Sequence, residues 1–134
     1  MIKQQILISI ILPTFNHAKF LKKAIESVIN QSYINWELIV IDNNSTDETF
    51  DIVNSYTDRR IRYSKIQNNG VIAASRNHGI SLSNGSWIAF LDSDDWWTNN
   101  KLSKSVEYIN EDKFDLIYHD LFLVYKTSQK SYKR

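Results

Sequence analysis

The sequence contains no cysteine, only one proline and only three glycines among its 134 residues. Without cysteine the chain forms neither a disulfide nor a metal site built from thiolates. So little proline and glycine leaves no flexible linker, and the glycines at positions 70, 79 and 85 do not form the G-x-G-x-x-G turn of a dinucleotide-binding dehydrogenase. The formal net charge of +1 predicts neither nucleic-acid binding nor a strongly acidic partner.

Long hydrophobic runs are also missing. The apolar run Ile6–Leu12 is too short to span a membrane, and it lacks the small-residue cleavage site of a signal peptide. We therefore expect a cytoplasmic protein, with association at the inner face of the membrane as an open alternative. The content of 43% hydrophobic and 13% aromatic residues is typical of a globular protein. We expect a single domain over residues 1–134, with residues 126–134 as a polar tail.

Segments with strand and helix patterns alternate along the chain. The expected strands are Ile6–Leu12, which Pro13 ends, Trp36–Ile41, Ile61–Ile66, Trp87–Leu91, and Asp115–Tyr125 as one long strand or two shorter ones. The expected helices are Lys19–Asn30, a helix that begins with a capping box at Ser45–Glu48 and reaches Tyr56, Val71–Ser83, and Lys101–Asn110. This order predicts an α/β fold with a mostly parallel sheet flanked by helices, a Rossmann-like arrangement that commonly binds nucleotides.

Three carboxylates, Asp92, Asp94 and Asp95, directly follow the apolar segment Trp87–Leu91. Ligands of open α/β sheets bind just beyond the carboxyl ends of the strands. Clustered carboxylates repel one another unless a positive group joins them, and Mg²⁺ or Mn²⁺ prefers such oxygen ligands. The pattern therefore predicts a divalent-metal site. The alternative is that Asp92 or Asp95 caps the next helix, although a cap needs one aspartate and not three.

Three further residues are candidates for binding a nucleotide. Asp42 ends the second strand, where its carboxylate can accept from a base N–H or a ribose hydroxyl, but Asp-Asn-Asn-Ser is also ideal turn sequence. Phe15, after the first strand, is suited either to stacking on a base or to the core. Arg76 lies among small residues and can offer a planar fork to a phosphate, or it is an exposed helix arginine.

The four segments SIILPTFN, WELIVIDNNSTDET, GVIAASRNHGI and WIAFLDSDD, in this order and spacing, resemble the N-terminal half of family 2 glycosyltransferases of the GT-A fold. The match runs from about Ser9 to Tyr125. The resemblance implies binding of a nucleotide diphosphosugar, usually a UDP-sugar. It also implies metal-assisted transfer of the sugar, with inversion, to an acceptor hydroxyl of a saccharide or lipid-linked molecule, as in synthesis of cell-surface polysaccharides.

The resemblance also implies roles for individual residues. Pro13, Thr14 and Phe15 match the loop beside the nucleoside, although many members have tyrosine in place of Phe15. Asp42 matches the acidic residue that recognises the base, and Arg76 matches the arginine near the nucleotide. The segment Asp92-Ser93-Asp94 matches the DxD motif. Asp94 is then the direct metal ligand, and Asp92 lies toward the ribose and the metal.

One part of the family pattern is missing. Family members are longer, and their general base is an aspartate beyond the strand that matches Asp115–Tyr125. The acidic pair Glu111-Asp112 precedes that segment and Asp120 lies within it, so we assign no base within the chain and expect it beyond Arg134. The open alternative is a donor-binding fragment or scaffold module without the acceptor half. Its exposed apolar residues, Leu121, Phe122, Leu123 and Val124, would then favour self-association.

Overall fold

The computed structural model describes residues 5–124 and 129–132. Its helices and strands run in the order β1 (Ile8–Thr14), α1 (Ala18–Ile29), β2 (Trp36–Asp42), α2 (Thr49–Asn54), β3 (Ile61–Lys65), α3 (Ile72–Leu82), β4 (Trp87–Phe90), α4 (Lys101–Ile109), β5 (Leu121–Val124) and β6 (Gln129–Tyr132). The chain divides into two compact units, residues 1–103 and 104–134, which are described separately. The grouping of all 134 residues into one domain stays a prediction.

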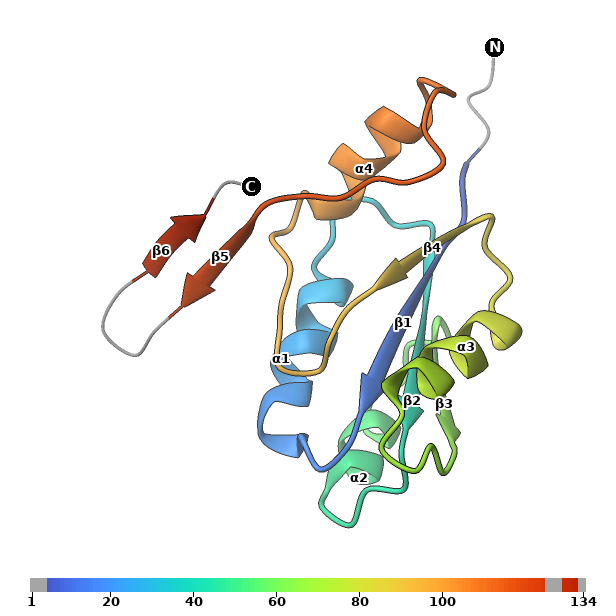
Figure 1. The fold of residues 1–134 in the computed structure, drawn as a ribbon, viewed down its shortest axis with the longest axis vertical. Helices are drawn as coiled ribbons and strands as arrows, with labels where there is room; N and C mark the ends of the chain where they lie inside the picture. The colour runs from blue at the N-terminus through green and yellow to red at the C-terminus, as the bar shows by residue number, and fades with distance from the viewer. Residues whose placement is uncertain (1–4, 125–128, 133–134) are drawn as a thin grey trace. The chain divides into compact units, whose positions relative to one another are not determined.

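The first unit is built on a four-stranded sheet in the order β3-β2-β1-β4, shown in Figure 1. All its pairings are parallel, with Ile8 opposite Trp36 and Trp87, and Leu38 opposite Ile61. A parallel sheet needs apolar residues on both faces, and every residue of β1 and β2 is indeed buried. The prediction of a mostly parallel sheet flanked by helices is confirmed.

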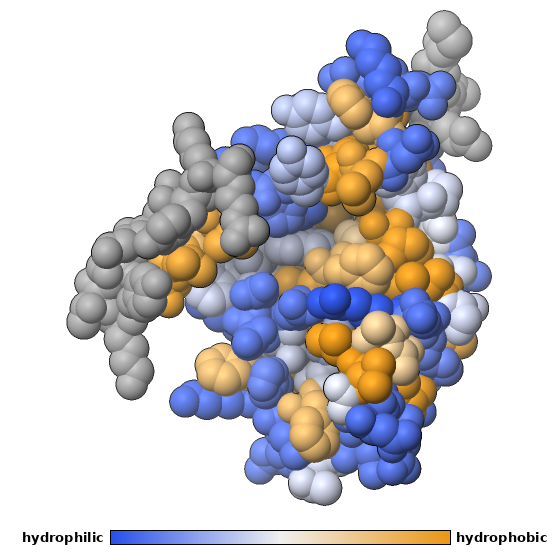
Figure 2. Space-filling view, viewed as in Figure 1, coloured by the Kyte–Doolittle hydropathy of each residue, from blue (hydrophilic) through white to orange (hydrophobic). Residues whose placement is uncertain are grey.

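Helices cover both faces of this sheet. On one face α3 packs against β1 and β2 so closely that a Cβ at Gly79 would lie 2.4 Å from Ile11 Cγ2. Amphipathic helix α1 contributes a buried stripe of four residues, Leu21, Ala24, Ile25 and Val28. Figure 2 shows hydrophobic side chains gathered over α3 and β4, where Ile72 and Phe90 are about half exposed, at 50% and 47%. Within the described residues, no helix is long and apolar enough to cross a membrane.

Pro13 does not end the first strand, so that prediction was wrong. β1 continues through Pro13 to Thr14 and stays paired with β2. The Ile8 N–H points toward β2, so by alternation the nitrogen of Pro13 points toward β4. Pairing with β4 ends at Ile11, so Pro13 removes no ladder hydrogen bond there.

The capping box at Ser45–Glu48 was also wrong. Helix α2 begins at Thr49 and ends at Asn54, short of Tyr56. Glu48, which directly precedes the helix, makes no capping hydrogen bond with its side chain. The Ser45 hydroxyl donates instead to the Asp42 carboxylate. The Ser-x-x-Glu pattern is present, but the Ser45 oxygen accepts from the Asn16 N–H and not from an N–H of α2.

The second unit contains a two-stranded antiparallel sheet of β5 and β6. The predicted strand Asp115–Tyr125 is therefore too long, because only Leu121–Val124 is strand among its described residues, and Tyr125 lies outside them. Part of the expected polar tail, Gln129–Tyr132, is strand β6. The side chains of β5 are 39–59% exposed, as expected for the residues named above for self-association, which itself stays a prediction.

A buried glutamate holds the amino-terminal ends of the strands together. Glu37 is 8% exposed and accepts hydrogen bonds from the Ser9 hydroxyl at 2.6 Å, from Asn84 and from Arg62 at 3.1 Å. Burial alone would raise the pKa of the Glu37 carboxyl, but these donors outweigh it and hold the pKa below its ordinary value. The ionised carboxylate therefore stabilises the fold.

We expect Glu37→Gln to lower the free energy of unfolding by about 2 kcal/mol at pH 7, since charge-assisted bonds are lost from a buried group. Because the pKa of Glu37 is lowered on folding, its contribution is complete above about pH 5 and is lost as the pH falls. Urea unfolding at pH 7 and pH 3 measures both effects. Glu26→Gln, at an exposed residue, is the control and should change stability little. An equal loss for Glu37→Gln at both pH values would contradict this account.

Candidate functional site

The site predicted from the sequence lies at the carboxyl-terminal edge of the parallel sheet. Thr14, at the end of β1, is directly opposite Asp42, at the end of β2. On the other side of β1, the N–H of Leu91 donates to the carbonyl of Ile11 at 3.1 Å, which places Asp92 next along the same edge. Residues from three sequence segments, near positions 14, 42 and 92, are thus brought together by strand register alone.

The Asp42 carboxylate is 1% exposed and accepts three hydrogen bonds. Its Oδ1 accepts from the Ser45 N–H at 3.0 Å and the Ser45 hydroxyl, and its Oδ2 accepts from the Tyr63 hydroxyl on β3. Burial, followed by the hydrogen bond to Asp42 and its charge, raises the pKa of Tyr63. The turn role of Asp42 is therefore present. Since a carboxylate has about four acceptor positions, these three bonds leave one position on Oδ2 unused.

The loops after β1 and β2 are joined by hydrogen bonds that the sequence did not predict. Asn16, at φ 50°, donates its N–H to the Ser45 hydroxyl at 2.9 Å and accepts from the Thr46 N–H at 2.8 Å. The Asp47 carboxylate accepts from the N–H of Ala18, at the first turn of α1, at 2.9 Å. These contacts fix the two loops that border Asp42.

The three residues predicted to lie beside the nucleoside, at the end of β1 and just after it, differ in exposure. Pro13 and Thr14 are buried, and the Thr14 hydroxyl has no hydrogen-bond partner within the described part of the chain. Phe15 is 52% exposed, so the interpretation that it belongs to the core is wrong. Its ring is accessible at the edge of the site, as stacking on a base would need.

Arg76 reaches the site from α3. Its Nη2 lies 2.8 Å from Asp92 Oδ1, and its guanidinium carbon lies 5.5 Å from the centre of the Phe90 ring. The Arg76 Nε is buried and has no hydrogen-bond partner among the described residues. Arg76 is therefore held beside the acidic segment and is not a solvated helix arginine.

The acidic segment does not cap a helix, so that alternative was wrong: α4 begins only at Lys101. Asp94 and Asp95 are exposed, and the Asp95 N–H donates to the Asp92 carbonyl in a tight turn. Partial burial, together with the charges of Asp94 and Asp92, raises the pKa of Asp95. Within the described residues, no group of three or more His, Cys, Asp or Glu side chains is placed to hold a metal ion. A cation here would therefore need oxygen ligands from its substrate as well.

One contact of the acidic segment was missed from the sequence. Ser93 is 4% exposed, and its hydroxyl lies 2.8 Å from Nδ1 of His17, the residue that precedes α1. No short motif in the sequence links the two positions, which are 76 residues apart.

We assign the general base of the family pattern to none of the described residues placed at this edge. The sequence predicts it beyond Arg134, and Arg134 itself lies outside the described residues. Of the acidic residues considered for the role, Glu111, Asp112 and Asp120 belong to the second unit, whereas the sheet edge belongs to the first. The position of the base beyond Arg134 therefore stays a prediction.

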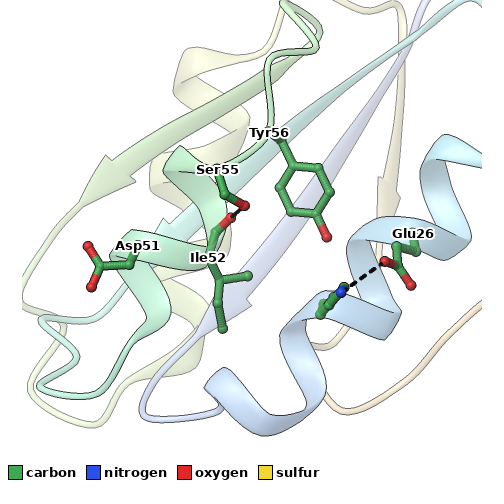
Figure 3. A pocket seen from close by; sticks show the side chains of 6 residues that line it. Glu26, Asp51, Ile52, Ser55 and Tyr56 are labelled. Carbon is green, nitrogen blue, oxygen red and sulfur yellow. Dashed lines mark hydrogen bonds and ion pairs between the residues drawn. The ribbon is translucent and has the colours of Figure 1, made fainter.

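A separate groove lies between α1 and α2, shown in Figure 3. It is lined by six residues, Lys22, Glu26, Asp51, Ile52, Ser55 and Tyr56. Burial and the charge of Glu26 raise the pKa of Tyr56. The groove contains none of the predicted nucleotide-binding residues.

Comparison with known proteins agrees with this geometry. Residues 9–134 match the family described as Glycosyl transferase family 2. The chain is 38% identical over 107 residues to a putative teichuronic acid biosynthesis glycosyltransferase, TuaG, of Bacillus subtilis, covering 78% of this chain and 42% of that protein. It is 35% identical over 117 residues to WfaP of Escherichia coli, named as a UDP-Glc:alpha-D-GlcNAc-diphosphoundecaprenol beta-1,3-glucosyltransferase, covering 87% of this chain and 47% of WfaP.

A solved structure is similar as well. The crystal structure of Staphylococcus aureus TarS residues 1–349 in complex with UDP is 30% identical to the chain with a TM-score of 0.74, covering 78% of this chain and 32% of that one. The chain thus spans about half the length, or less, of the relatives it matches. With its parallel sheet and the match over residues 9–134, the chain belongs to glycosyl transferase family 2 and has the GT-A fold.

Proposed function

We propose that this chain binds the sugar donor of a family 2 glycosyltransferase, a nucleotide diphosphosugar with UDP as its nucleotide. The observation that carries the proposal is the meeting of Asp42, Phe15, and the Arg76–Asp92 pair at one edge of the sheet. This edge offers a hydrogen-bond acceptor for a nucleobase, an accessible aromatic ring, and the Arg76 guanidinium beside carboxylates. The TarS complex with UDP, and the UDP-Glc named for WfaP, support uridine as the nucleoside.

The chemistry of donor binding follows from these side chains. The Oδ2 of Asp42 would accept from an N–H of the base, while Pro13 and Thr14 would shape the loop beside the nucleoside. Arg76 would offer its guanidinium to a phosphate, since its side chain is 35% exposed beside Asp92. Asp92 already occupies one side of that guanidinium, which orients the fork.

The residues of the acidic segment fit a divalent cation, Mn²⁺ or Mg²⁺. The Asp94 carboxylate is exposed and makes no hydrogen bond or ion pair within the described part of the chain, and its charge raises the pKa of Asp95. Both observations are expected where a cation is to be held. Asp94 would be the direct ligand, with Asp92 beside it and Ser93 between them. When bound, the metal would neutralise charge on the departing nucleoside diphosphate.

The acceptor side of the reaction is less complete. Transfer with inversion needs an acceptor hydroxyl on the face opposite the leaving group and a base within hydrogen-bond reach of it. We assign neither group to a described residue, and we propose that the base follows Arg134 in the longer relatives' pattern. The WfaP name supports a lipid-linked saccharide as acceptor, and the teichuronic acid biosynthesis named for TuaG supports a role in polysaccharide synthesis. Association with the inner face of the membrane stays a proposal.

The first test is titration calorimetry with UDP, with and without Mn²⁺. We expect binding in both conditions and tighter binding with the metal, because Asp42 and Phe15 act on the nucleoside while Asp94 acts through the cation. Asp42→Asn should weaken binding in both conditions, by about tenfold for one charged hydrogen bond in a buried site. Equal UDP affinity with and without Mn²⁺ would remove the metal from the proposal.

We expect Asp94→Ala to abolish the Mn²⁺-dependent gain in UDP affinity without lowering the melting temperature of the ligand-free protein. Because Asp94 raises the pKa of Asp95, the repulsion is present above the pKa of Asp95 and disappears as the pH falls below its ordinary value. The variant should therefore be as stable as the parent or more stable at pH 7, and equally stable near pH 3. The control is Asp51→Ala, at an exposed position of α2. A steep fall in melting temperature would show that Asp94 is structural.

We expect residues 1–134 alone not to transfer sugar to an acceptor at an appreciable rate. Loss of general base catalysis costs about 10²–10⁴ in rate, and loss of acceptor positioning costs more. Slow hydrolysis of the donor can persist, since water needs no acceptor site. The test is to incubate the chain with UDP-sugars, Mn²⁺ and saccharide acceptors and to measure UDP release and product mass. Acceptor-dependent transfer would rule out the alternative of a non-catalytic module and would mean that a base, Asp95 or Asp120 first, lies within the chain.

A further inference from the structure

The turn that carries Asp92 and Asp94 is tied to the start of α1 by one side-chain contact. Ser93, between the two aspartates, is 4% exposed, and its hydroxyl lies 2.8 Å from Nδ1 of His17. Ser93 is buried while Asp94 beside it is exposed, so the turn points one side chain inward and the next one outward. Whichever tautomer His17 adopts, Nδ1 and the hydroxyl can form this bond, because a hydroxyl both donates and accepts.

His17 is itself held firmly. Its carbonyl accepts the N–H groups of Phe20, at 2.9 Å, and Leu21, at 3.0 Å, in the first turn of α1. The His17 ring meets the Phe20 ring edge-on, with the ring centres 5.9 Å apart and the planes at 79°. The His17 backbone is therefore anchored at the start of α1, and its imidazole contacts the Phe20 ring as well as Ser93.

The two aspartates of the turn depend on this anchor to different degrees. Asp92 is held by its own ion pair to Arg76 at 2.8 Å. Within the described residues, the Asp94 carboxylate has no hydrogen bond or ion pair, so its position follows from its backbone. Ser93 is the adjacent residue, and its bond to His17 is the side-chain contact that fixes the backbone at that point.

We infer that His17 is a positioning residue for the acidic segment: through Ser93 it places the Asp94 carboxylate where a cation held jointly with a diphosphate would bind. This inference rests on the proposed donor-binding function and adds to it a residue outside the acidic segment. His17 touches neither the nucleotide nor the cation in this role. Partners that orient a metal ligand in this way typically contribute about 10–100-fold in metal affinity.

The test compares four proteins by titration with UDP, with and without Mn²⁺: the parent, His17→Ala, His17→Asn and His17→Gln. An asparagine can place its amide close to the position of Nδ1, whereas a glutamine amide corresponds to Nε2. We expect His17→Ala and His17→Gln to lose about tenfold of the Mn²⁺-dependent gain in UDP affinity. UDP affinity without Mn²⁺ should stay unchanged, and His17→Asn should restore most of the gain.

A matched control lies on α3. His78 Nε2 is 2.9 Å from the Ser64 hydroxyl on β3, which is the same type of pair at another position. His78→Ala removes a comparable histidine–serine bond and should leave the Mn²⁺-dependent gain intact. Ser93→Ala approaches the contact from its other partner and should reproduce His17→Ala. The double variant His17→Ala with Ser93→Ala should lose no more than either single variant, since both remove one bond.

The outcomes separate this inference from the proposed function. If the parent protein binds no UDP, both the proposed donor binding and the role of His17 are overturned. If the parent binds UDP more tightly with Mn²⁺ but His17→Ala does so equally, only the role of His17 is overturned. An equal loss of UDP affinity with and without Mn²⁺ would also overturn it, because a merely structural contact would act in that way. Failure of His17→Asn to restore the gain would show that the contact between Nδ1 and Ser93 does not determine the Mn²⁺-dependent gain in UDP affinity.

Discussion

The parallel pairing of β1 with both β2 and β4 is the constraint on which the site depends. β1 is buried along its whole length, so its register with each neighbour is fixed by packing on both faces. Because the strands are parallel, residues that follow them meet at one edge of the sheet. A slip of β2 by one residue would turn the Asp42 side chain to the other face of the sheet, away from the Tyr63 hydroxyl that now contacts it.

Charge at this edge is only partly compensated by the protein. The Asp42 carboxylate is surrounded by hydrogen-bond donors, and Asp92 is paired with Arg76. Asp94 and Asp95 remain close to each other, and their repulsion, with burial, raises the pKa of Asp95. A stable fold gains nothing from this repulsion, since one polar residue would end β4 equally well. An uncompensated charge at this edge is therefore what the proposed cation site would require.

Much of this arrangement could be predicted from the sequence, because the signals are local. Apolar runs predicted the four strands of the first unit, and the ends of those runs placed Asp42 and Asp92 at the carboxyl-terminal edge of the sheet, where Arg76 pairs with Asp92. Their binding roles stay predictions. Pro13 was misjudged because its effect depends on where β4 ends, which the residues around it do not reveal. The same kind of error affected Ser45, whose hydroxyl accepts from the N–H of Asn16 on another loop and not from a backbone N–H of α2.

The contacts that could not be predicted are those that fix the orientation of the site. The Tyr63–Asp42 bond joins residues 21 positions apart, and the His17–Ser93 bond joins residues 76 apart. Such pairs depend on how side chains from different elements meet in space. No repeating pattern in a single sequence indicates which distant residues will meet. Their chemistry is nevertheless specific. The Tyr63 hydroxyl donates to Asp42 Oδ2, and burial together with this bond raises the pKa of Tyr63. Asp42 is thus oriented by fixed donors in the ligand-free protein, which is the arrangement that the proposed binding of a base N–H would need.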